Sequence, residues 1–401
     1  MSANGTQALF NCANIYPTEY DPLYPLYSYI VNGILMAIVV ACGAIGNCLT
    51  IYILSLKQLQ AKINGYFIAL AVWDNVLLTS SLILYAKAAL QYGELPSYGP
   101  HVFVYLALYP VSNIATTASV WMLLATAIER YLAISDPLRH QRAYTPLRIK
   151  LILIATSATA VLFNVTKFLE ISIIWCMPPD GSAPVPGIMV TPLRLSTPYF
   201  IVYHVLLSVC LVYFGPISVQ TLLTVLISYH LRKSLHHTKL SVYRKSKKRE
   251  NLEATMTRMF VIVCLKFLIC FTLPTVLNIC EVVISAGNFF RDISLTYAVD
   301  FSNLLVVCNS AFNFPIYMVF CPRFRKELIH RLSCKRIGRV RADHQGSTHT
   351  HNPDNCITEQ DGLLQIPRNG RKKYSYSASA RSSYSCDPLN NYTKEETVSS
   401  V

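Results

Sequence analysis

Seven apolar segments of this 401-residue chain are each long enough to cross a lipid bilayer. A helix needs ~20 mainly apolar residues to span the hydrocarbon core, and it satisfies its own backbone polar groups there. The segments are Tyr29–Leu56, Tyr66–Leu90, Val102–Ile134, Leu147–Trp175, Pro198–Leu231, Ala254–Ser285 and Ile293–Phe320. Charged residues make up only 14% of the chain, against roughly 25% in soluble domains. We therefore predict an all-α membrane protein with a seven-helix bundle, not a soluble enzyme.

Positive charge is distributed unevenly between the connections of these segments. The net charge of +14 lies mostly in short blocks between apolar runs, which indicates membrane topology and not nucleic-acid binding. One set of connections carries Lys57 and Lys62, then Arg139, Arg142, Arg148 and Lys150, then the block 232–249, and then Arg323, Arg325, Lys326 and Arg331. The other set has no cation in residues 1–28 and only isolated ones such as Arg194 and Arg291. Because cytoplasmic loops are enriched in Lys and Arg, we predict a cell-membrane protein with an extracellular amino terminus and a cytosolic carboxyl terminus.

Four regions follow from this pattern. Residues 1–28 form an extracellular tail and residues 29–321 form the membrane bundle. Residues 322–334 place Phe324, Leu328 and Leu332 at helical spacing opposite basic residues. That pattern predicts an amphipathic helix lying on the inner membrane lipids. Residues 335–401 are polar, and we expect a disordered cytoplasmic tail.

Short polar and proline motifs occur on six of the seven predicted spans. They are Gly46-Asn47, Leu70-Ala71-Val72-Trp73-Asp74, Glu129-Arg130-Tyr131 followed by Asp136-Pro137-Leu138, Pro216, Phe271-Thr272-Leu273-Pro274, and Asn309-Ser310 with Asn313-Phe314-Pro315-Ile316-Tyr317. In this order, from about residue 29 to 334, they resemble the rhodopsin-like G-protein-coupled receptors.

Further motifs resemble those of the invertebrate receptors for FMRFamide-like neuropeptides. These are Tyr109-Pro110, Ser119-Val120-Trp121, the segment Asn164 to Glu170, Glu253-Ala254-Thr255-Met256, the segment Leu273 to Glu281, and Asn313-Phe314 before Tyr317. The resemblance implies a receptor for an extracellular peptide that signals through a heterotrimeric G protein and catalyses no reaction. A receptor for a non-peptide ligand is the alternative within the family. A multi-span transporter is the alternative from another class, but the chain shows no two related halves.

The resemblance implies a sodium site in the middle of the bundle. Asp74 would anchor it, because an ionisable group at mid-span is by default a functional candidate. Oxygen ligands would come from Ser119, Asn309, Ser310 and Asn313. The alternative is a polar network that holds the helices together without an ion. We expect no other cofactor, and Lys266 of the sixth span receives no function.

The resemblance also implies an activation switch at the cytosolic end. Arg130 would pair with Glu129 and, across the bundle, with Glu253, in a contact that opens when the sixth helix swings outward. The alternative is an Arg that extends to the membrane interface. The remaining residues of the expected switch are Tyr131, Pro216, Pro274, Asn313 and Tyr317.

The chain departs from the family pattern at several positions. Tyr105 stands where the third span usually carries a disulfide-bonded Cys, so we expect that tether to be absent. Cys12 and Cys176 are the candidates for a different extracellular disulfide, although free thiols or a bond to Cys280 are alternatives. Thr272 stands where the family usually has Trp, and Thr224 stands where a Tyr is common. Pro315 comes one residue later than usual in the seventh span.

Several residues are candidates for modification or for partner binding. Asn4 begins a glycosylation sequon in the extracellular tail. Cys334, at the end of the amphipathic helix, is placed for palmitoylation. Phosphorylation within residues 374–386 would recruit arrestin-like proteins, and Ser399-Ser400-Val401 fits a PDZ-domain ligand.

The resemblance implies a ligand that ends in Arg-Phe-amide. Its guanidinium would pair best with a desolvated carboxylate. Glu170, Glu281 and Asp300 lie toward the extracellular ends of their spans and are the candidates for ligand binding. Alternatively, each acid faces water or pairs with Lys167 or Arg291.

The loop charges generate a test of topology. An epitope inserted after Ser2 should be stained on intact cells, whereas one added after Val401 should be stained only after permeabilisation. The physical reason is the retention of Lys-rich and Arg-rich loops on the cytosolic side. The reverse staining pattern would contradict the predicted orientation.

Overall fold

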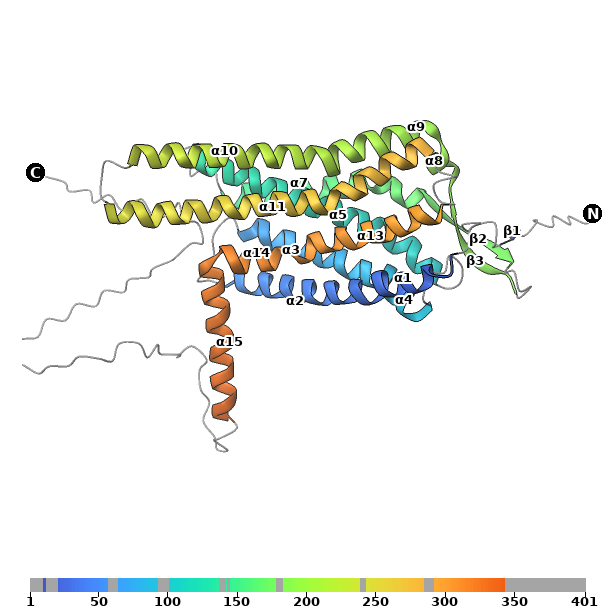
Figure 1. Cartoon of the computed structure of the whole chain (residues 1–401), viewed down its shortest axis with the longest axis horizontal. Coiled ribbons are helices and arrows are strands. Elements are labelled where there is room, and N and C mark those ends of the chain that lie inside the picture. Colours follow the sequence, from blue (N-terminus) through green and yellow to red (C-terminus); the bar gives the residue numbers. More distant parts are fainter. Residues whose placement is uncertain are drawn as a thin grey trace, which may run out of the picture.

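The computed structural model describes residues 10–11, 21–56, 64–92, 101–136, 142, 145–177, 183–238, 243–284 and 292–342. Long helices run side by side along one axis and form a bundle (Figure 1). They are α1 (Tyr24–Ser28) with a π-helical continuation Tyr29–Leu35, α2 (Met36–Leu54), α3 (Asn64–Ser81) with its continuation Leu82–Ala86 and α4 (Lys87–Tyr92), α5 (His101–Ser135), α7 (Pro146–Phe163), α10 (Phe214–Thr238), α11 (Tyr243–Ile284), α13 (Ile293–Ala311) and α14 (Asn313–Phe320).

Six helical stretches among the described residues are long and apolar enough to cross a membrane. They coincide with six of the predicted spans, and α11 contains nearly all of the remaining one, Ala254–Ser285. The prediction of a seven-helix bundle is therefore confirmed. The first span begins earlier than predicted. Its helix starts at Tyr24 and continues without a break into α2.

The fourth span ends earlier than predicted. The prediction extended it to Trp175, but α7 ends at Phe163 and is followed by a 3-10 turn, Val165–Leu169, and by strand β2 (Ile171–Met177). The Asn164 side chain donates to the Ala160 carbonyl oxygen at 2.8 Å and thereby competes with continued helix. The Ile-rich segment that follows favours an extended backbone.

A three-stranded sheet covers one end of the bundle, hereafter the sheet end (Figure 1). Strand β2 pairs antiparallel with β3 (Val185–Val190) and parallel with β1 (Phe10–Asn11). Short helices α8 (Pro192–Leu195) and α9 (Thr197–Tyr199) lead from β3 into the fifth span, which begins with π-helical stretches Phe200–Leu207 and Val209–Tyr213.

Prolines disturb the fifth and seventh spans. Pro216 follows the π-helical stretches, and a Cβ at the preceding Gly215 would lie 1.8 Å from the Cys210 carbonyl oxygen, so this wide turn requires glycine. In the seventh span, α13 ends at Ala311 and α14 begins at Asn313. Pro315 explains this break, because a proline ring clashes with the carbonyl four residues earlier.

Helix α15 (Pro322–Ala342) runs across the bundle axis at the opposite end, hereafter the α15 end (Figure 1). It is longer than the predicted segment 322–334. Phe324 and Leu328 are buried against Ile53 and Leu54 of α2, whereas Leu332 is exposed. The helix therefore packs part of its apolar face on the bundle itself and leaves the rest available to lipid.

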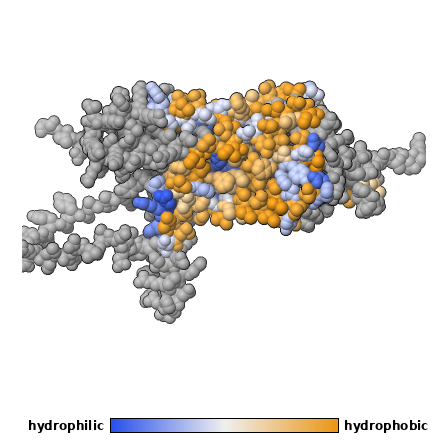
Figure 2. Space-filling view, in the orientation of Figure 1, coloured by the Kyte–Doolittle hydropathy of each residue, from blue (hydrophilic) through white to orange (hydrophobic). Residues whose placement is uncertain are grey.

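The bundle is apolar on its outside as well as inside. The main core cluster joins α3, α5, α10, α11 and α14 through residues that include Leu70, Met122, Ile227, Phe267 and Ile316. Figure 2 shows hydrophobic residues over much of the described surface between the two ends. Exposed residues such as Ile38 and Leu162 add to this surface. A membrane protein presents such a surface because lipid is its solvent.

Gly43 of α2 generates a test of this packing. A Cβ there would lie 2.6 Å from the Ala311 Cβ, whereas a Cβ at Gly65 makes only ordinary contacts, the nearest at 3.5 Å. Gly43→Ala should therefore lower the free energy of unfolding by about 1–3 kcal/mol, because overpacking forces the two helices apart. The melting temperature of the receptor purified in detergent measures this effect. Gly65→Ala is the matched control, and equal melting temperatures for the two variants would contradict the close approach of α2 and α13.

Candidate functional site

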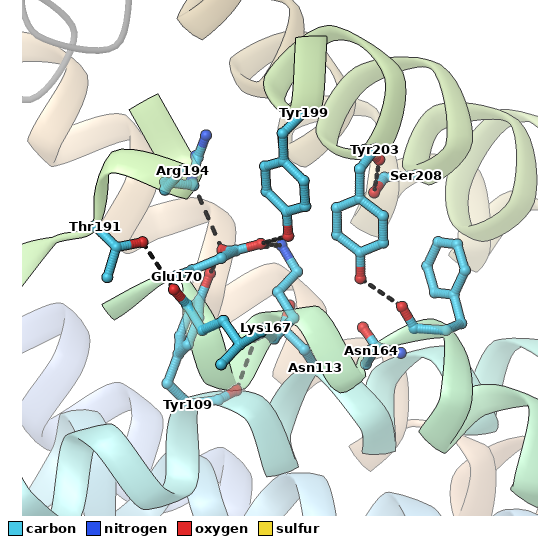
Figure 3. A network of polar contacts seen from close by, with 12 residues as sticks. Tyr109, Asn113, Asn164, Lys167, Glu170, Thr191, Arg194, Tyr199, Tyr203 and Ser208 are labelled. Atoms are coloured by element: carbon cyan, nitrogen blue, oxygen red, sulfur yellow. Dashed lines mark hydrogen bonds and ion pairs between the residues drawn. The ribbon is translucent and has the colours of Figure 1, made fainter. Parts of the chain in front are cut away.

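Two carboxylates and two cations meet at the sheet end, and Figure 3 shows three of them, Glu170, Lys167 and Arg194. Glu170, directly before β2, is 1% exposed. Its Oε1 lies 3.2 Å from the Lys167 ammonium and its Oε2 lies 3.7 Å from Nε of Arg194. The Arg194 guanidinium also donates to Glu281 of α11. The charges within this group, hereafter the Arg194 cluster, cancel.

Aromatic side chains surround the Arg194 cluster. The Tyr199 hydroxyl donates to Oε1 of Glu170 at 2.7 Å, and the Tyr109 hydroxyl donates to Oε2 at 3.3 Å. The Lys167 ammonium lies 5.3 Å from the ring centre of Tyr203, within the range of a cation–π contact. These contacts stabilise the Glu170 carboxylate and the Lys167 ammonium, which would otherwise be costly to bury.

The structure therefore separates the three acids predicted to bind a ligand. Glu170 and Glu281 share one cluster with cations of the chain itself, as in the alternative that paired each acid internally. Lys167 was named in that alternative, whereas Arg194 was noted only as an isolated cation and Arg291 lies outside the described residues. Hydropathy alone gave no signal that Arg194 would turn inward.

Asp300 of α13 has different surroundings. It is 4% exposed, and its Oδ2 accepts a hydrogen bond of 2.9 Å from the Tyr24 hydroxyl of α1. The ring of Tyr297 packs against Tyr24 and against Tyr27, at centroid distances of 5.3 and 4.5 Å. Among the residues that the structure describes, no Lys, Arg or His forms a salt bridge with Asp300.

A disulfide is present at the sheet end. Cys176 of β2 is fully buried and disulfide-bonded. Cys280 is a free thiol, which removes it as the partner. Cys12 lies outside the described residues, but strand β1 ends one residue before it and pairs Asn11 with Met177. The Cys12–Cys176 pairing stays a prediction that this register supports.

A polar layer around Asp74 lies in the middle of the bundle. Asp74 is fully buried, and its two carboxylate oxygens accept hydrogen bonds from the Ser119 hydroxyl at 2.5 Å and from the Asn313 amide at 2.7 Å. Asn47 donates weakly to the Ser310 carbonyl oxygen, at 3.4 Å. The structure thus brings Ser119 and Asn313 of the predicted sodium site onto Asp74, and it adds the Lys266 ammonium, 2.5 Å from Oδ1 of Asn313.

The Glu129-Arg130-Tyr131 part of the predicted switch lies toward the α15 end. Arg130 of α5 is 5% exposed. Its neighbour Glu129 lies 3.4 Å from the guanidinium of Arg148 in α7, a partner that the sequence analysis did not name. The ring of Tyr131 contacts His230 of α10 edge-on, at a centroid distance of 5.8 Å.

Other predicted residues are placed less completely. The Tyr317 ring contacts both Phe67 and Phe324. Pro274 lies inside an unbroken α11. Glu253 and Cys334 lie in α11 and α15, but the structure does not describe their side chains. Asn4 and Ser399-Ser400-Val401 lie outside the described residues.

A bundle of seven apolar helices with a buried Asp–Ser–Asn layer at its centre defines a multi-pass membrane protein. Residues 46–317 match the model of the 7 transmembrane receptor (rhodopsin family). The chain belongs to this family.

Individual relatives narrow the comparison. The FMRFamide receptor of Drosophila melanogaster is 29% identical over 359 residues, which cover 87% of this chain and 63% of the fly protein. The chain therefore spans less than two thirds of that relative's length. The FMRFamide peptide receptor frpr-18 of Caenorhabditis elegans is 26% identical over 305 residues, 73% of this chain and 67% of the worm protein. Somatostatin receptor type 5 of Bos taurus is 28% identical over 317 residues, 77% of each chain. The resemblance to FMRFamide receptors is confirmed.

The Arg194 cluster generates a stability prediction. Arg194→Ala leaves Glu170 and Glu281 buried with one cation fewer, and breaking a buried pair costs about 3–5 kcal/mol. The melting temperature in detergent should fall, and the double variant Arg194→Ala/Glu281→Ala should recover part of the loss, because it removes one uncompensated carboxylate. Lys150→Ala, at an exposed position of α7, is the control. A double variant less stable than Arg194→Ala would show that the two charges do not compensate each other.

Proposed function

We propose that this protein is a cell-surface receptor for an extracellular neuropeptide of the Arg-Phe-amide type, signalling through a heterotrimeric G protein. Membership of the rhodopsin family supports the receptor role, and the similarity to FMRFamide receptors of a fly and a worm supports the peptide class. In this proposal the sheet end faces outside and the α15 end faces the cytosol, in agreement with the loop charges.

The observation that supports a cationic ligand is the environment of Asp300. A buried carboxylate is normally paired with a cation or held by several hydrogen bonds. Asp300 accepts one from the Tyr24 hydroxyl and also interacts with the Asn32 side chain, so both of these neighbours are uncharged, and Tyr27 and Tyr297 place electron-rich rings beside Tyr24. A ligand guanidinium would supply the missing charge, form a bidentate pair with the carboxylate and stack on the rings.

Glu170 and Glu281 have another role in this proposal. Their charges already cancel those of Lys167 and Arg194, so a second guanidinium would have to displace an internal partner. The Arg194 cluster instead joins the end of the fourth span, helix α8 and α11. In this proposal it holds these three elements in place at the end of the bundle where the peptide would bind.

The α15 end would bind the G protein. The proposed switch comprises Arg130 and Tyr131 of α5, Glu253 of α11 and Tyr317 of α14, with Pro216 and Pro274 as the bends that let the helix ends move. Arrestin-like proteins at the phosphorylated tail, a PDZ-domain protein at the carboxyl terminus and membrane lipids along α15 are further proposed partners. A receptor for a non-peptide ligand is the competing function.

The ligand site is tested with the peptide FMRFamide on cells that express the receptor, with calcium and cyclic-AMP readouts. Replacing one partner of a desolvated charge pair costs ~2–5 kcal/mol, so Asp300→Asn should reduce potency at least about 30-fold. Glu281→Gln should have a smaller effect than Asp300→Asn, since Glu281 already has Arg194 as its partner.

Asp292→Asn is the matched control. Asp292 is exposed on the same helix and caps it by accepting from the Ser294 amide, a role that Asn also fills. The Asp292→Asn substitution removes the same charge at a position outside the proposed site. Potency within about threefold of the parent for Asp300→Asn, at matched surface expression, would refute the Asp300 site. A receptor that responds to small amines but to none of the amidated peptides would favour the competing function, a receptor for a non-peptide ligand.

A further inference from the structure

The Lys266 ammonium occupies a position inside the bundle that the sequence analysis left unexplained. Lys266 lies on α11, about two turns from Pro274, and is 9% exposed. Its Nζ donates to the Asn309 carbonyl oxygen at 2.9 Å and to Oδ1 of Asn313 at 2.5 Å. An ammonium buried between helices is costly unless it meets acceptors and a counter-charge.

The counter-charge is Asp74. The Asn313 side chain bridges the two charges, because its Oδ1 accepts from Lys266 while its amide nitrogen donates to Oδ2 of Asp74 at 2.7 Å. The other carboxylate oxygen accepts from Ser119 at 2.5 Å. Each oxygen of Asp74 thus has a donor within the protein, and the charge of the layer is balanced through one amide.

A sodium ion fits this arrangement poorly. It would need a carboxylate together with uncharged oxygens as ligands, but Oδ1 of Asn313 is already bonded to Lys266. Two cations in one buried layer would also repel each other strongly in a low-dielectric interior. One feature does favour ion binding, since Oδ1 of Asn309 and Oδ1 of Asn47 have no hydrogen-bond partner among the described residues. These oxygens could ligate a cation once the ammonium is gone.

We propose that Lys266 is a tethered replacement for the sodium ion at Asp74. The ammonium balances the charge of Asp74 without a metal and joins the sixth span to the seventh at the break between α13 and α14. The receptor is consequently insensitive to sodium, and loss of the Lys266 charge converts the layer into a sodium site made of Asp74, Ser119, Asn309 and Asn313.

The experiment measures the melting temperature of the purified full-length receptor, without peptide, in about 150 mM NaCl and in choline chloride of equal concentration, so that screening is matched. A bound ion stabilises the folded state by mass action. The parent receptor should melt at the same temperature in both salts. Lys266→Met should melt at least about 2 °C higher in NaCl than in choline chloride.

Three further variants make the result specific. Lys266→Gln removes the charge but keeps a polar side chain of similar length, and it replaces Lys266→Met in the experiment if that variant does not fold. The double variant Lys266→Met/Asp74→Asn lacks the anionic ligand and should lose the sodium effect. Lys150→Met removes an exposed positive charge and should behave as the parent does.

A parent receptor that is stabilised by sodium would overturn the proposal. So would a Lys266→Met or Lys266→Gln receptor that folds but responds equally to both salts, because Lys266 would then not be what excludes the ion. Since no peptide is added, failure of this test is independent of the proposed ligand and of the Asp300 site.

Discussion

A charged side chain inside a membrane bundle must find its counter-charge within the protein, because hydrocarbon offers none. The interior of this receptor is organised around that constraint at three depths. At the sheet end Arg194 and Lys167 balance two glutamates. At mid-depth Lys266 balances Asp74 through Asn313, and toward the α15 end Arg148 meets Glu129. The apolar packing of the helices surrounds these layers.

Each charge layer joins different helices, and the two layers nearer the sheet end join helices that are distant in sequence, so the layers also couple the helices mechanically. The sixth span contributes Glu281 to one layer and Lys266 to the next, and Pro274 lies between them. A movement of α11 about this proline would change both layers at once. A buried ion pair adds little net stability, because desolvation offsets the attraction. In the proposed function such a pair would instead act as a switch, because two discrete arrangements can differ by one exchanged partner.

Asp300 is informative because it departs from this organisation. Among the residues that the structure describes, the other buried acids of the bundle meet a cation of the chain, directly or through one amide, whereas Asp300 meets the Tyr24 hydroxyl and the Asn32 side chain. This uncharged environment is the reason that the proposed function assigns the ligand guanidinium to Asp300. The contrast with Glu170 and Glu281 could not be drawn from the sequence, where all three acids look alike.

The sequence by itself determined the number, order and approximate length of the spans, because the bilayer imposes a length and an apolarity that are read locally. It also identified Asp74, Ser119 and Asn313 as one polar layer through the family motifs. Tertiary structure decided which charges pair. Arg194 and Glu281 are 87 residues apart, and Lys266 and Asn313 are 47 apart. Such pairings depend on how each helix is rotated and where it bends, and these follow from packing between helices that no local pattern encodes.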